Sequence, residues 1–344
     1  MVRVYVGLSG GVDSAVSAAL LSRDGHDVVG CFIRITRPEF IECTWREDRL
    51  DAMRVAAHLR IPFREVDLSD AYSRLVISDM IETYERGETP NPDILCNSRI
   101  KFDAFLSWAL DEGADMIATG HYARVSHDPV GLYCGIDEEK DQSYFLSRVS
   151  PEALSRVLTP VGGMTKRDVR ALAQECELPV ATKRDSQGLC FVGDVTLPEF
   201  LSRFISPREG EALNQQGGVI GTHAGACLYT IGQRHGFRVD DARPHYVTRI
   251  DTHSNTITVS PDPADATSTR VRLHSLNWLS TPKTEYAYAA APRYRSRVPA
   301  VVESIGAETI VRFPEPTIAA PGQTCVIYDG DQVVGAGVIA VHST

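Results

Sequence analysis

The residues near the start of the chain that could bind phosphate form a glycine-rich stretch, Ser9-Gly10-Gly11-Val12-Asp13-Ser14. Paired glycines let a backbone approach a phosphate closely, and the N-terminus of a following helix directs N–H groups and a positive dipole end toward it. Ser9 and Ser14 add hydroxyl donors, whereas Asp13 would repel a phosphate and is better suited to hold Mg²⁺ that bridges phosphate oxygens. The lysine of a Walker loop is absent, so this is not a GxxxxGK[ST] site. By itself the glycine pair also fits a plain strand-to-helix turn with a capping serine.

A second stretch, Thr89 to Asn97 (TPNPDILCN), places a carboxylate and a thiol three residues apart. Its two prolines predict a stiff loop just before a helix. A helix N-terminus favours the thiolate form of Cys96, which is the form that a nucleophile requires. Asp93 is then placed for proton transfer or for orienting a base. The alternative for this string alone is a proline-containing turn with a buried cysteine.

Three further segments carry groups that could take part in chemistry. Asp185 to Phe191 (DSQGLCF) supplies a second cysteine, Cys190, on a glycine-containing loop; Gly120 to Arg124 (GHYAR) follows a strand end; Lys140 to Leu146 (KDQSYFL) precedes a helix. There is no CxxC pair and no compact cysteine framework, so neither a secreted disulfide scaffold nor a zinc ribbon is indicated. We expect the other cysteines to be structural: Cys31, Cys43, Cys134, Cys176, Cys227 and Cys325. For Cys43 a role near the site is the alternative.

The first half of the chain alternates apolar strands with helices. Strands are expected over 2–6, 28–35, 63–66 and 115–119, and helices over 14–23, 47–60 and 100–110. This rhythm predicts a doubly wound parallel sheet of the α/β class, whose ligands bind beyond the carboxyl ends of the strands. The loops at Gly7, Thr89 and Gly120 are therefore the expected positions of the site.

After a helix over 197–205, short β-like segments separated by Gly, Pro and Asn dominate. Tyr246–Ile250 and Thr256–Val259 flank a turn and predict a hairpin. Alternation from about residue 265 predicts a small antiparallel barrel or sandwich, for which we favour the barrel. The expected domains are a catalytic α/β domain over 1–198, a small central β-rich domain over 199–263 and a C-terminal β-barrel over 264–344.

The 344 residues include 35 Lys+Arg and 45 Asp+Glu, for a formal net charge of -10. The imbalance lies in residues 1–200, while residues 201–344 carry 13 of each sign. This acidity argues against a generic nucleic-acid coat, although a local basic face around Arg293, Arg295 and Arg297 stays open. No apolar run approaches the roughly 20 residues of a membrane helix and no signal peptide is recognisable, so we expect a cytoplasmic protein with no membrane partner.

The SGGVDS string resembles the PP-loop of the ATP pyrophosphatases, which cleave ATP between its α and β phosphates and adenylate their substrate. Across the whole chain the sequence resembles the tRNA-specific 2-thiouridylase (MnmA) family. The blocks that carry this resemblance appear in order as SGGVDS, GETPNPDILCN, KFDAF, ATGHY, KDQSYFL, DSQGLCF, TIGQR and PGQ. The chain departs from the family's usual pattern at Phe32–Thr36 and at His235–Arg238.

The resemblance implies a role for individual residues. It assigns ATP binding to Gly7, Leu8, Ser9, Gly10, Gly11, Val12, Asp13, Ser14, Ile33 and Gly120. It assigns contact with the target base to Asn91, Pro92 and Asp93. It makes Cys96 the nucleophile and Cys190 the carrier of a persulfide, with Asp93 as a further catalytic residue. It assigns contact with tRNA to His121, Lys140, Asp141, Gln142, Arg293, Tyr294 and Gln323.

The implied reaction is ATP-dependent 2-thiolation of the wobble uridine of tRNA, with ATP and Mg²⁺ as cofactors. Adenylation of uridine O2 makes AMP the leaving group, Cys190 delivers sulfur, and a Cys96–Cys190 disulfide is left for reduction. The sulfur would come from a relay protein or a cysteine desulfurase, and the enzyme is expected to be a monomer. Two alternatives to this chemistry stay open: attack by free sulfide and the use of an iron–sulfur cluster. Two alternatives to this class of protein stay open as well: a PP-loop ligase that acts on a small metabolite, and a catalytically silent tRNA-binding protein.

Overall fold

The computed structural model describes residues 1–36, 45–184, 197–283, 286–305 and 308–341. They group into two compact units. Unit 1 comprises Met1–Val76, Pro92–Asp194 and Asp331–Val333, and unit 2 comprises Ile77–Asn91, Val195–Gly330 and Val334–Thr344. Each unit therefore combines segments that are far apart in the sequence. No helix of the described ranges is long and apolar enough to cross a membrane.

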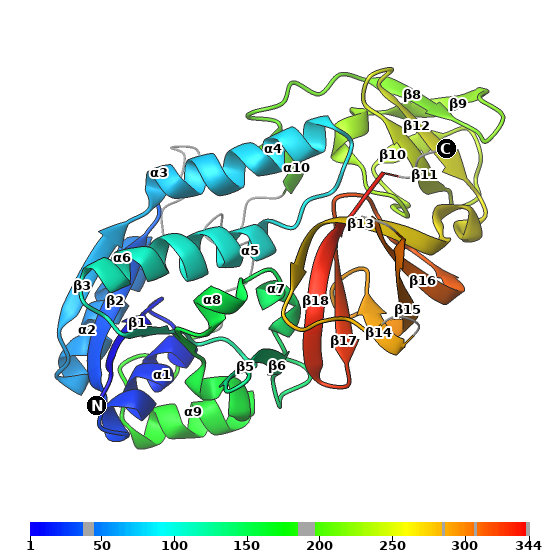
Figure 1. Cartoon of the computed structure of the whole chain (residues 1–344). Coiled ribbons are helices and arrows are strands. Elements are labelled where there is room, and N and C mark those ends of the chain that lie inside the picture. Colours follow the sequence, from blue (N-terminus) through cyan, green and yellow to red (C-terminus); the bar gives the residue numbers. More distant parts are fainter. Residues whose placement is uncertain (37–44, 185–196, 284–285, 306–307, 342–344) are drawn as a thin grey trace. The chain divides into compact units, whose positions relative to one another are not determined.

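Unit 1 is built on a parallel sheet with strand order β3-β2-β1-β4-β7 (Figure 1). These strands are β1 (Arg3–Gly7), β2 (Asp27–Arg34), β3 (Phe63–Asp67), β4 (Met116–Ala118) and β7 (Val157–Leu158). The strands that follow β1 in the sequence are first added on one side of it, as β2 and β3, and later on its other side, as β4 and β7. The switch in direction therefore lies between β1 and β4, which is where open α/β sheets bind ligands.

Helices cover both faces of this sheet. The helical elements up to Tyr72 are α1 (Val12–Arg23), α2 (Trp45–Leu59) and α3 (Ser69–Tyr72), and α7 (Ser143–Leu146), α8 (Pro151–Leu154), η3 (Pro160–Gly163) and α9 (Lys166–Glu175) follow later. Val4 and Val6 of β1 pack in one core with α1, α2 and α9, whereas Tyr5 contacts Trp108 on the opposite face, with ring centroids 5.9 Å apart. The alternation of β1 thus fills two cores, as a doubly wound sheet requires.

A single helical run extends from Pro92 to Asp111. It consists of α5 (Pro92–Leu95), the π-helix η2 (Cys96–Ala104) and α6 (Phe105–Asp111). The sequence predicted a helix only from Ile100, with a stiff loop before it, and this prediction was wrong by two turns. Proline at the first helical position needs no N–H donor and has a helix-compatible φ, so Pro92 begins the helix rather than prolonging the loop.

Unit 1 also contains an antiparallel hairpin that the sequence analysis did not predict, β5 (Ala123–His127) and β6 (Val130–Cys134). Two residues from near the end of the chain, Gln332 and Val333, pair with Tyr133 and Leu132 of β6.

Unit 2 begins with the end of a second π-helix, η1 (Ser73–Ile77), and α4 (Ser78–Glu85). Its first sheet has the order β10-β9-β8-β12-β11 and includes the predicted hairpin as β11 (Tyr246–Asp251) and β12 (Thr256–Ser260). The other members of this part are α10 (Leu197–Leu201), β8 (Gly210–Leu213), β9 (Val219–His223), η4 (Ala226–Leu228), β10 (Phe237–Val239) and η5 (Pro263–Ala266). Val247, Ile257 and Val259 lie in its core.

The rest of unit 2 is a closed antiparallel barrel. Its strands are β13 (Ser268–Trp278), β14 (Ala287–Ala291), β15 (Val298–Ile305), β16 (Glu308–Thr317), β17 (Thr324–Asp329) and β18 (Gln332–Ile339). The order is β13-β16-β15-β14-β17-β18, and β18 pairs back onto β13. The predicted fold class, a doubly wound α/β domain followed by a β-rich domain and a β-barrel, is confirmed.

Candidate active site

The glycine-rich stretch forms the turn between β1 and α1. Gly10 has a φ of +75°, a left-handed conformation that glycine adopts without steric penalty. Ser14 Oγ accepts a hydrogen bond from the Ser9 N–H at 3.2 Å, and Ser9 Oγ accepts one from the Gly11 N–H at 3.3 Å. Gly11 is the N-cap of α1 and, being glycine, contributes no side-chain cap to this helix.

Gly120, just after β4, packs directly against the first turn of α1. A Cβ on Gly120 would lie 2.6 Å from the Ser14 backbone nitrogen and 2.7 Å from the Asp13 carbonyl carbon. Only glycine therefore lets the end of β4 approach the glycine-rich loop this closely; we call this loop, Ser9–Ser14, the phosphate loop after its expected ligand. This contact lies at the switch between β1 and β4.

Asp13 is held by two residues that the sequence analysis did not connect with it. Lys166 Nζ donates to both carboxylate oxygens of Asp13, at 2.7 and 2.9 Å, and the Tyr122 hydroxyl donates to Oδ1 at 2.7 Å. The Lys166 side chain is only 14% exposed and that of Asp13 is 31% exposed. The phosphate loop, which lacks a Walker lysine, thus has an ammonium group beside it that comes from another part of the chain.

Lys166 reaches this position because it is the first residue of α9. Thr165 caps the helix by accepting from the Asp168 N–H at 3.2 Å, and the Lys166 N–H donates to Asp137 at 2.8 Å. The sequence analysis gave Lys166 no role. Lys166 and Asp13 are 153 positions apart, so no local pattern could have paired them.

Ile33 is the penultimate residue of β2, at the carboxyl edge of the sheet, and is half-buried. The next residue, Arg34, pairs with Asp67 at the end of β3 and with Glu65 at 3.7 Å. Ile33 therefore borders the same sheet edge as the phosphate loop, beside an ion-pair network that the sequence analysis did not predict.

Asp93 and Cys96 lie one turn apart in the helical run that begins at Pro92. Asp93 is half-buried, whereas Cys96 is fully buried and begins the π-helix. Short π-helical segments are rare and are frequent at functional sites. Asn97, beside Cys96, is 2% exposed; its Nδ2 donates to the Phe145 carbonyl at 3.3 Å, while its buried Oδ1 has no hydrogen-bond partner among the described residues.

The second predicted reactive cysteine, Cys190, lies outside the described residues, and so does Cys43. The distance between Cys96 and Cys190 therefore stays a matter of prediction. Among the parts of the chain that the structure describes, no group of three or more His, Cys, Asp or Glu side chains could hold a metal ion.

His121 is 8% exposed and hydrogen-bonds through Nδ1 to Thr119 Oγ1 at 2.8 Å. Burial, with a further contribution from the charge of Lys101, holds the pKa of His121 well below its usual value. The imidazole is thus neutral near pH 7, so it can donate and accept hydrogen bonds but carries no positive charge.

The Lys140–Gln142 segment is braced by its own side chains. Asp141 accepts from the N–H groups of Gly135 and Ser143, at 2.9 and 3.1 Å, and Gln142 Oε1 accepts from the Tyr122 N–H at 2.9 Å. Lys140 is half-buried. Gln142 thereby fixes the backbone of Tyr122, whose hydroxyl binds Asp13.

In unit 2, Gln323 holds the loop that precedes Asn91. Its Nε2 donates to the carbonyls of Thr89, at 2.8 Å, and Pro90, at 3.3 Å. The Thr89 N–H donates to the Pro321 carbonyl at 2.8 Å, and the Thr89 hydroxyl donates to Thr230 Oγ1 at 3.0 Å. Three of the sequence blocks, TPNPD, TIGQR and PGQ, therefore meet at Thr89.

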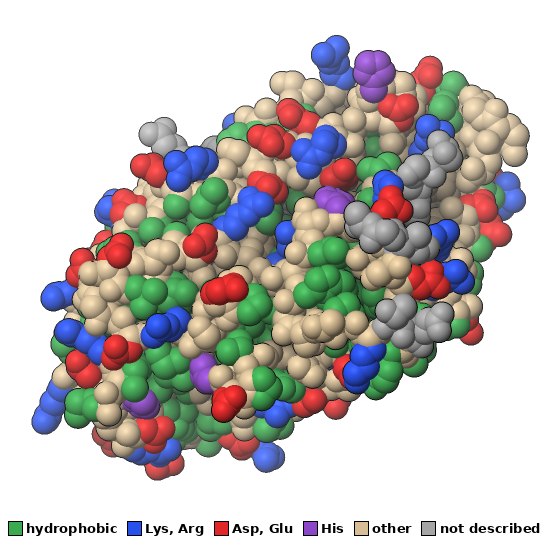
Figure 2. Space-filling model, viewed as in Figure 1, with side chains coloured by type: hydrophobic (Ala, Val, Ile, Leu, Met, Phe, Trp, Pro, Cys, Tyr) green, Lys and Arg blue, Asp and Glu red, His purple; other side chains and the backbone are tan. Residues whose placement is uncertain are grey.

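Arg293 and Tyr294 lie between β14 and β15, on the surface of the barrel. Arg293 is exposed, and neighbouring arginines stack on aromatic rings: Arg295 over Tyr294 at 5.3 Å and Arg297 over Tyr328 at 3.9 Å. On the face shown in Figure 2, Lys and Arg side chains are interspersed with acidic ones. Charge–aromatic pairs of this kind suit RNA, which offers both phosphates and bases for stacking.

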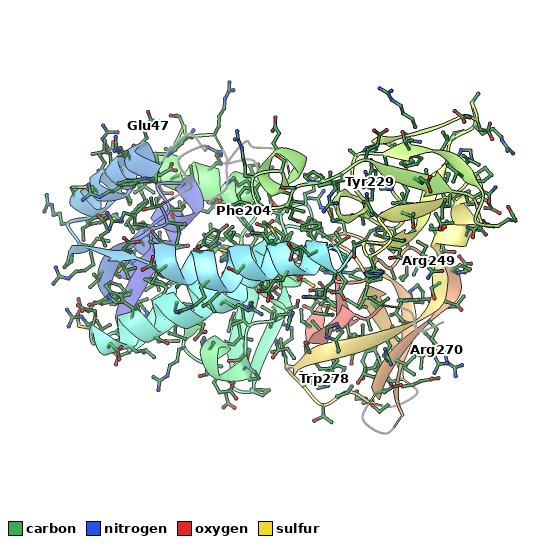
Figure 3. All side chains as sticks on the ribbon, turned by 90° about the horizontal axis from the view of Figure 1, so that it is seen from above. Glu47, Phe204, Tyr229, Arg249, Arg270 and Trp278 are labelled. Carbon is green, nitrogen blue, oxygen red and sulfur yellow. The ribbon has the colours of Figure 1, made fainter. Side chains whose placement is uncertain are left out.

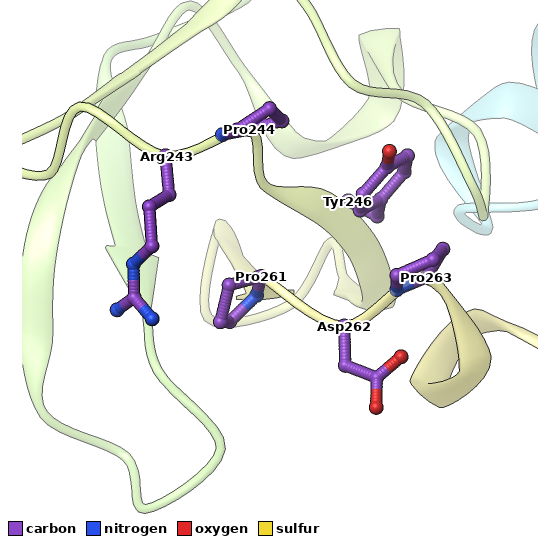
Figure 4. Close-up of a pocket in the computed structure, with 6 residues that line it drawn as sticks. All are labelled: Arg243, Pro244, Tyr246, Pro261, Asp262 and Pro263. Carbon is purple, nitrogen blue, oxygen red and sulfur yellow. The ribbon is translucent and has the colours of Figure 1, made fainter.

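A separate hollow of about 440 Å³ lies in unit 2 (Figure 4). It is lined by Arg243, Pro244, Tyr246, Pro261, Asp262 and Pro263. None of these residues belongs to the predicted site. Arg243 donates to Asp241 at 2.9 Å and holds the pKa of that carboxyl at about 2.

Three protein-family models match successive parts of the chain. The model described as "tRNA methyl transferase HUP domain" matches residues 2–194, "tRNA methyl transferase PRC-barrel domain" matches 198–261 and "Aminomethyltransferase beta-barrel domain" matches 268–339. The parallel sheet with a glycine-rich loop at its switch point is thus an α/β domain of the HUP class, followed by two β-barrel modules.

The full-length relatives narrow this class. The chain is 39% identical to the tRNA-specific 2-thiouridylase MnmA of Lysinibacillus sphaericus, over 98% of this chain and 94% of the relative. It is 41% identical to MnmA of Paracidovorax citrulli and 40% identical to MnmA of Akkermansia muciniphila, each over 98% of this chain and at least 96% of the relative. The chain belongs to the MnmA family of tRNA-specific 2-thiouridylases, which confirms the resemblance noted from the sequence.

Proposed function

We propose that this protein catalyses the ATP-dependent 2-thiolation of the wobble uridine of tRNA. The observation that carries the proposal is the phosphate loop with the Asp13–Lys166 pair beside it, at the switch point of a parallel sheet. The relatives at about 40% identity are named for this activity, and the match covers essentially their whole length.

The residues around the loop fit ATP with Mg²⁺. Gly10 and Gly120 let the backbone of α2 and the end of β4 pack directly against the loop, the exposed Ser9 offers a hydroxyl, and Lys166 offers a positive charge. Asp13 supplies the carboxylate that would hold Mg²⁺. ATP supplies the adenylyl group; the protein binds its phosphates and stabilises the charge of the departing pyrophosphate.

The reaction we propose has three balanced steps. Uridine O2 attacks the α-phosphorus of ATP, and pyrophosphate leaves. The terminal sulfur of a Cys190 persulfide attacks C2, and AMP leaves with the former O2. The Cys96 thiolate then attacks Cys190 Sγ, and the bond between Cys190 Sγ and the sulfur on C2 breaks. The 2-thiouridine is released, and a Cys96–Cys190 disulfide forms. An external thiol reductant must restore both thiols.

The partners follow from this chemistry. A persulfide donor, either a sulfur-relay protein or a cysteine desulfurase, loads Cys190. Asn91, Pro92 and Asp93 contact the target base, and His121, Lys140, Asp141, Gln142, Arg293, Tyr294 and Gln323 contact or shape the path of the tRNA. We propose a monomer that works in the cytoplasm.

The test is mass analysis of tRNA incubated with the protein, ATP, Mg²⁺ and a persulfide donor. The expected result is the replacement of one oxygen by sulfur at the wobble uridine, and no such change in an assay that works with an MnmA relative would overturn the proposal. Cys190→Ser should abolish transfer while ATP and tRNA binding persist. Turnover without tRNA that survives Cys96→Ala and Cys190→Ala would favour a small-metabolite ligase, and iron in the purified active protein would favour cluster chemistry.

A further inference from the structure

The turn between β6 and α7 fixes the backbone of Tyr122, one of the two residues that hold Asp13. This turn covers residues 137–142, and we call it the 137–142 turn. Gln142 Oε1 accepts a hydrogen bond from the Tyr122 N–H at 2.9 Å, and the Gln142 N–H donates to the Tyr122 carbonyl, also at 2.9 Å. Because Tyr122 is bound to Gln142 through both its N–H and its carbonyl, a shift of the turn shifts Tyr122 as well.

Asp137 connects the same turn to Lys166, the second residue that holds Asp13. Its Oδ2 accepts from the Lys166 N–H at 2.8 Å. Its Oδ1 accepts from the N–H groups of Glu139 and Lys140, at 3.1 and 3.2 Å. A single half-buried carboxylate thus joins the backbone of the turn to the first residue of α9.

Both connections end at the carboxylate of Asp13. The Tyr122 hydroxyl donates to its Oδ1 and Lys166 Nζ donates to both of its oxygens, and Lys166 Nζ lies 5.7 Å from the centroid of the Tyr122 ring. Tyr122 and Lys166 are mostly buried, so water can replace these two donors only in part. The 137–142 turn therefore positions both groups that fix Asp13 and set the charge around it.

The two ends of this network belong to two different ligands of the proposed reaction. The resemblance to the MnmA family assigns tRNA contact to Lys140, Asp141 and Gln142 of the turn, and Glu138 and Glu139 beside them are exposed. Asp13 lies in the phosphate loop and is the carboxylate suited to Mg²⁺. Two ligands that bias one shared set of contacts change each other's affinity by the same factor.

We propose that the 137–142 turn couples the binding of tRNA to the binding of ATP, with Tyr122 and Asp137 as positioning residues. This inference rests on the proposed function. A tRNA on the turn stabilises the positions of Tyr122 and Lys166, so that Lys166 stays within reach of the phosphates and Asp13 within reach of Mg²⁺. ATP then binds more tightly to the protein that already holds tRNA, and adenylation is favoured when both substrates are present.

The experiment measures the Kd for α,β-methylene-ATP with Mg²⁺ by isothermal titration, once without tRNA and once with saturating substrate tRNA. The methylene bridge blocks cleavage between the α and β phosphates, so binding is measured without adenylation. The ratio of the two Kd values is the coupling factor. It is compared between the wild-type protein, Tyr122→Phe, which removes the hydroxyl bound to Asp13, and Asp137→Ala, which removes the carboxylate bound to Lys166.

Two other buried tyrosines supply matched controls. Tyr5 donates to the Glu112 carbonyl at 3.1 Å, on the face of the sheet opposite to α1. Tyr229, which is labelled in Figure 3, donates to the Gly236 carbonyl in unit 2. Tyr5→Phe and Tyr229→Phe each remove one internal hydrogen bond, as Tyr122→Phe does, so they report the effect of a lost hydrogen bond away from Asp13.

For the wild-type protein and both controls we expect tRNA to lower the Kd for the analogue about 5- to 30-fold, a range typical of coupled sites. In Tyr122→Phe and Asp137→Ala the two Kd values should approach each other. The Kd for tRNA without nucleotide should stay unchanged, because neither residue is proposed to touch RNA. If Asp137→Ala fails to fold by thermal melting, Tyr122→Phe decides the outcome.

Three results would overturn the inference: equal Kd values for the analogue with and without tRNA in the wild-type protein, a coupling factor that Tyr122→Phe leaves unchanged, or an equal loss of coupling in the two controls. Thiolation of the same tRNA by the wild-type protein is measured in parallel. Its absence refutes the proposed function and the inference with it, whereas thiolation together with equal Kd values refutes the inference alone.

Discussion

Replacement of Lys166 by methionine tests the charge arrangement at the phosphate loop. The substitution keeps the length of the side chain but removes the ammonium group that donates to both oxygens of Asp13. A hydrogen bond to a charged group contributes about 1.5–3 kcal/mol, and Asp13, being 31% exposed and still bound by Tyr122, can recover part of this from water. We therefore expect a loss of roughly 1.5 kcal/mol in the free energy of unfolding, or about 3–6 °C in Tm.

The effect on ATP should be larger than the effect on stability. If Lys166 turns from Asp13 to the phosphates when ATP binds, the loss of that contact should raise the Kd for ATP about 10- to 100-fold. Isothermal titration with ATP measures this directly, and Lys166→Arg, which keeps the charge, is the control. A double-mutant cycle with Asp13→Asn should show strong coupling in Tm. Unchanged ATP affinity together with additive effects on Tm would refute the reasoning.

Three further substitutions test the contacts around the loop. Gly120→Ala should push the end of β4 away from α1, which should lower the free energy of unfolding by about 1–3 kcal/mol and weaken ATP binding. Thermal melting and titration with ATP measure these two effects, and a variant with normal ATP affinity would contradict the prediction. Gln323→Ala removes two hydrogen bonds to Thr89 and Pro90 and should raise KM for tRNA without changing ATP affinity; an unchanged KM would count against the role of this contact. The pKa of His121 is lower in the folded protein than in an unfolded chain, so below about pH 6.5 the unfolded state binds more protons. The free energy of unfolding therefore decreases as the pH is lowered. His121→Gln should flatten the decrease in Tm between pH 7 and pH 5, and a variant that loses Tm as steeply as wild type would exclude His121 as its source.

The phosphate loop could be predicted because its determinants are local: an apolar strand, paired glycines and a helix follow one another in the sequence. The fold class was predictable for the same reason, since strand and helix periods can be read over short windows. Lys166 could not be connected with Asp13, because their contact depends on how α9 packs against α1. The start of the helix at Pro92 was missed because proline was interpreted as a loop residue, although it is equally suited to a first helical turn.

The π-helix at Cys96–Ala104 has a consequence for the direction of the thiol. An α-helix turns about 100° per residue, whereas winding with i→i+5 hydrogen bonds turns less, so this nine-residue segment shifts the angular phase between Cys96 and Phe105. The run from Pro92 to Asp111 is one continuous rod, and the winding of its π-helical part fixes the angle between its two ends. Phe105 and Ala109 set how the rod packs on the sheet, and the winding between them and Cys96 sets where the sulfur points. Insertion or deletion of a single residue in this segment would redirect the thiol while the packing of α6 stayed as it is.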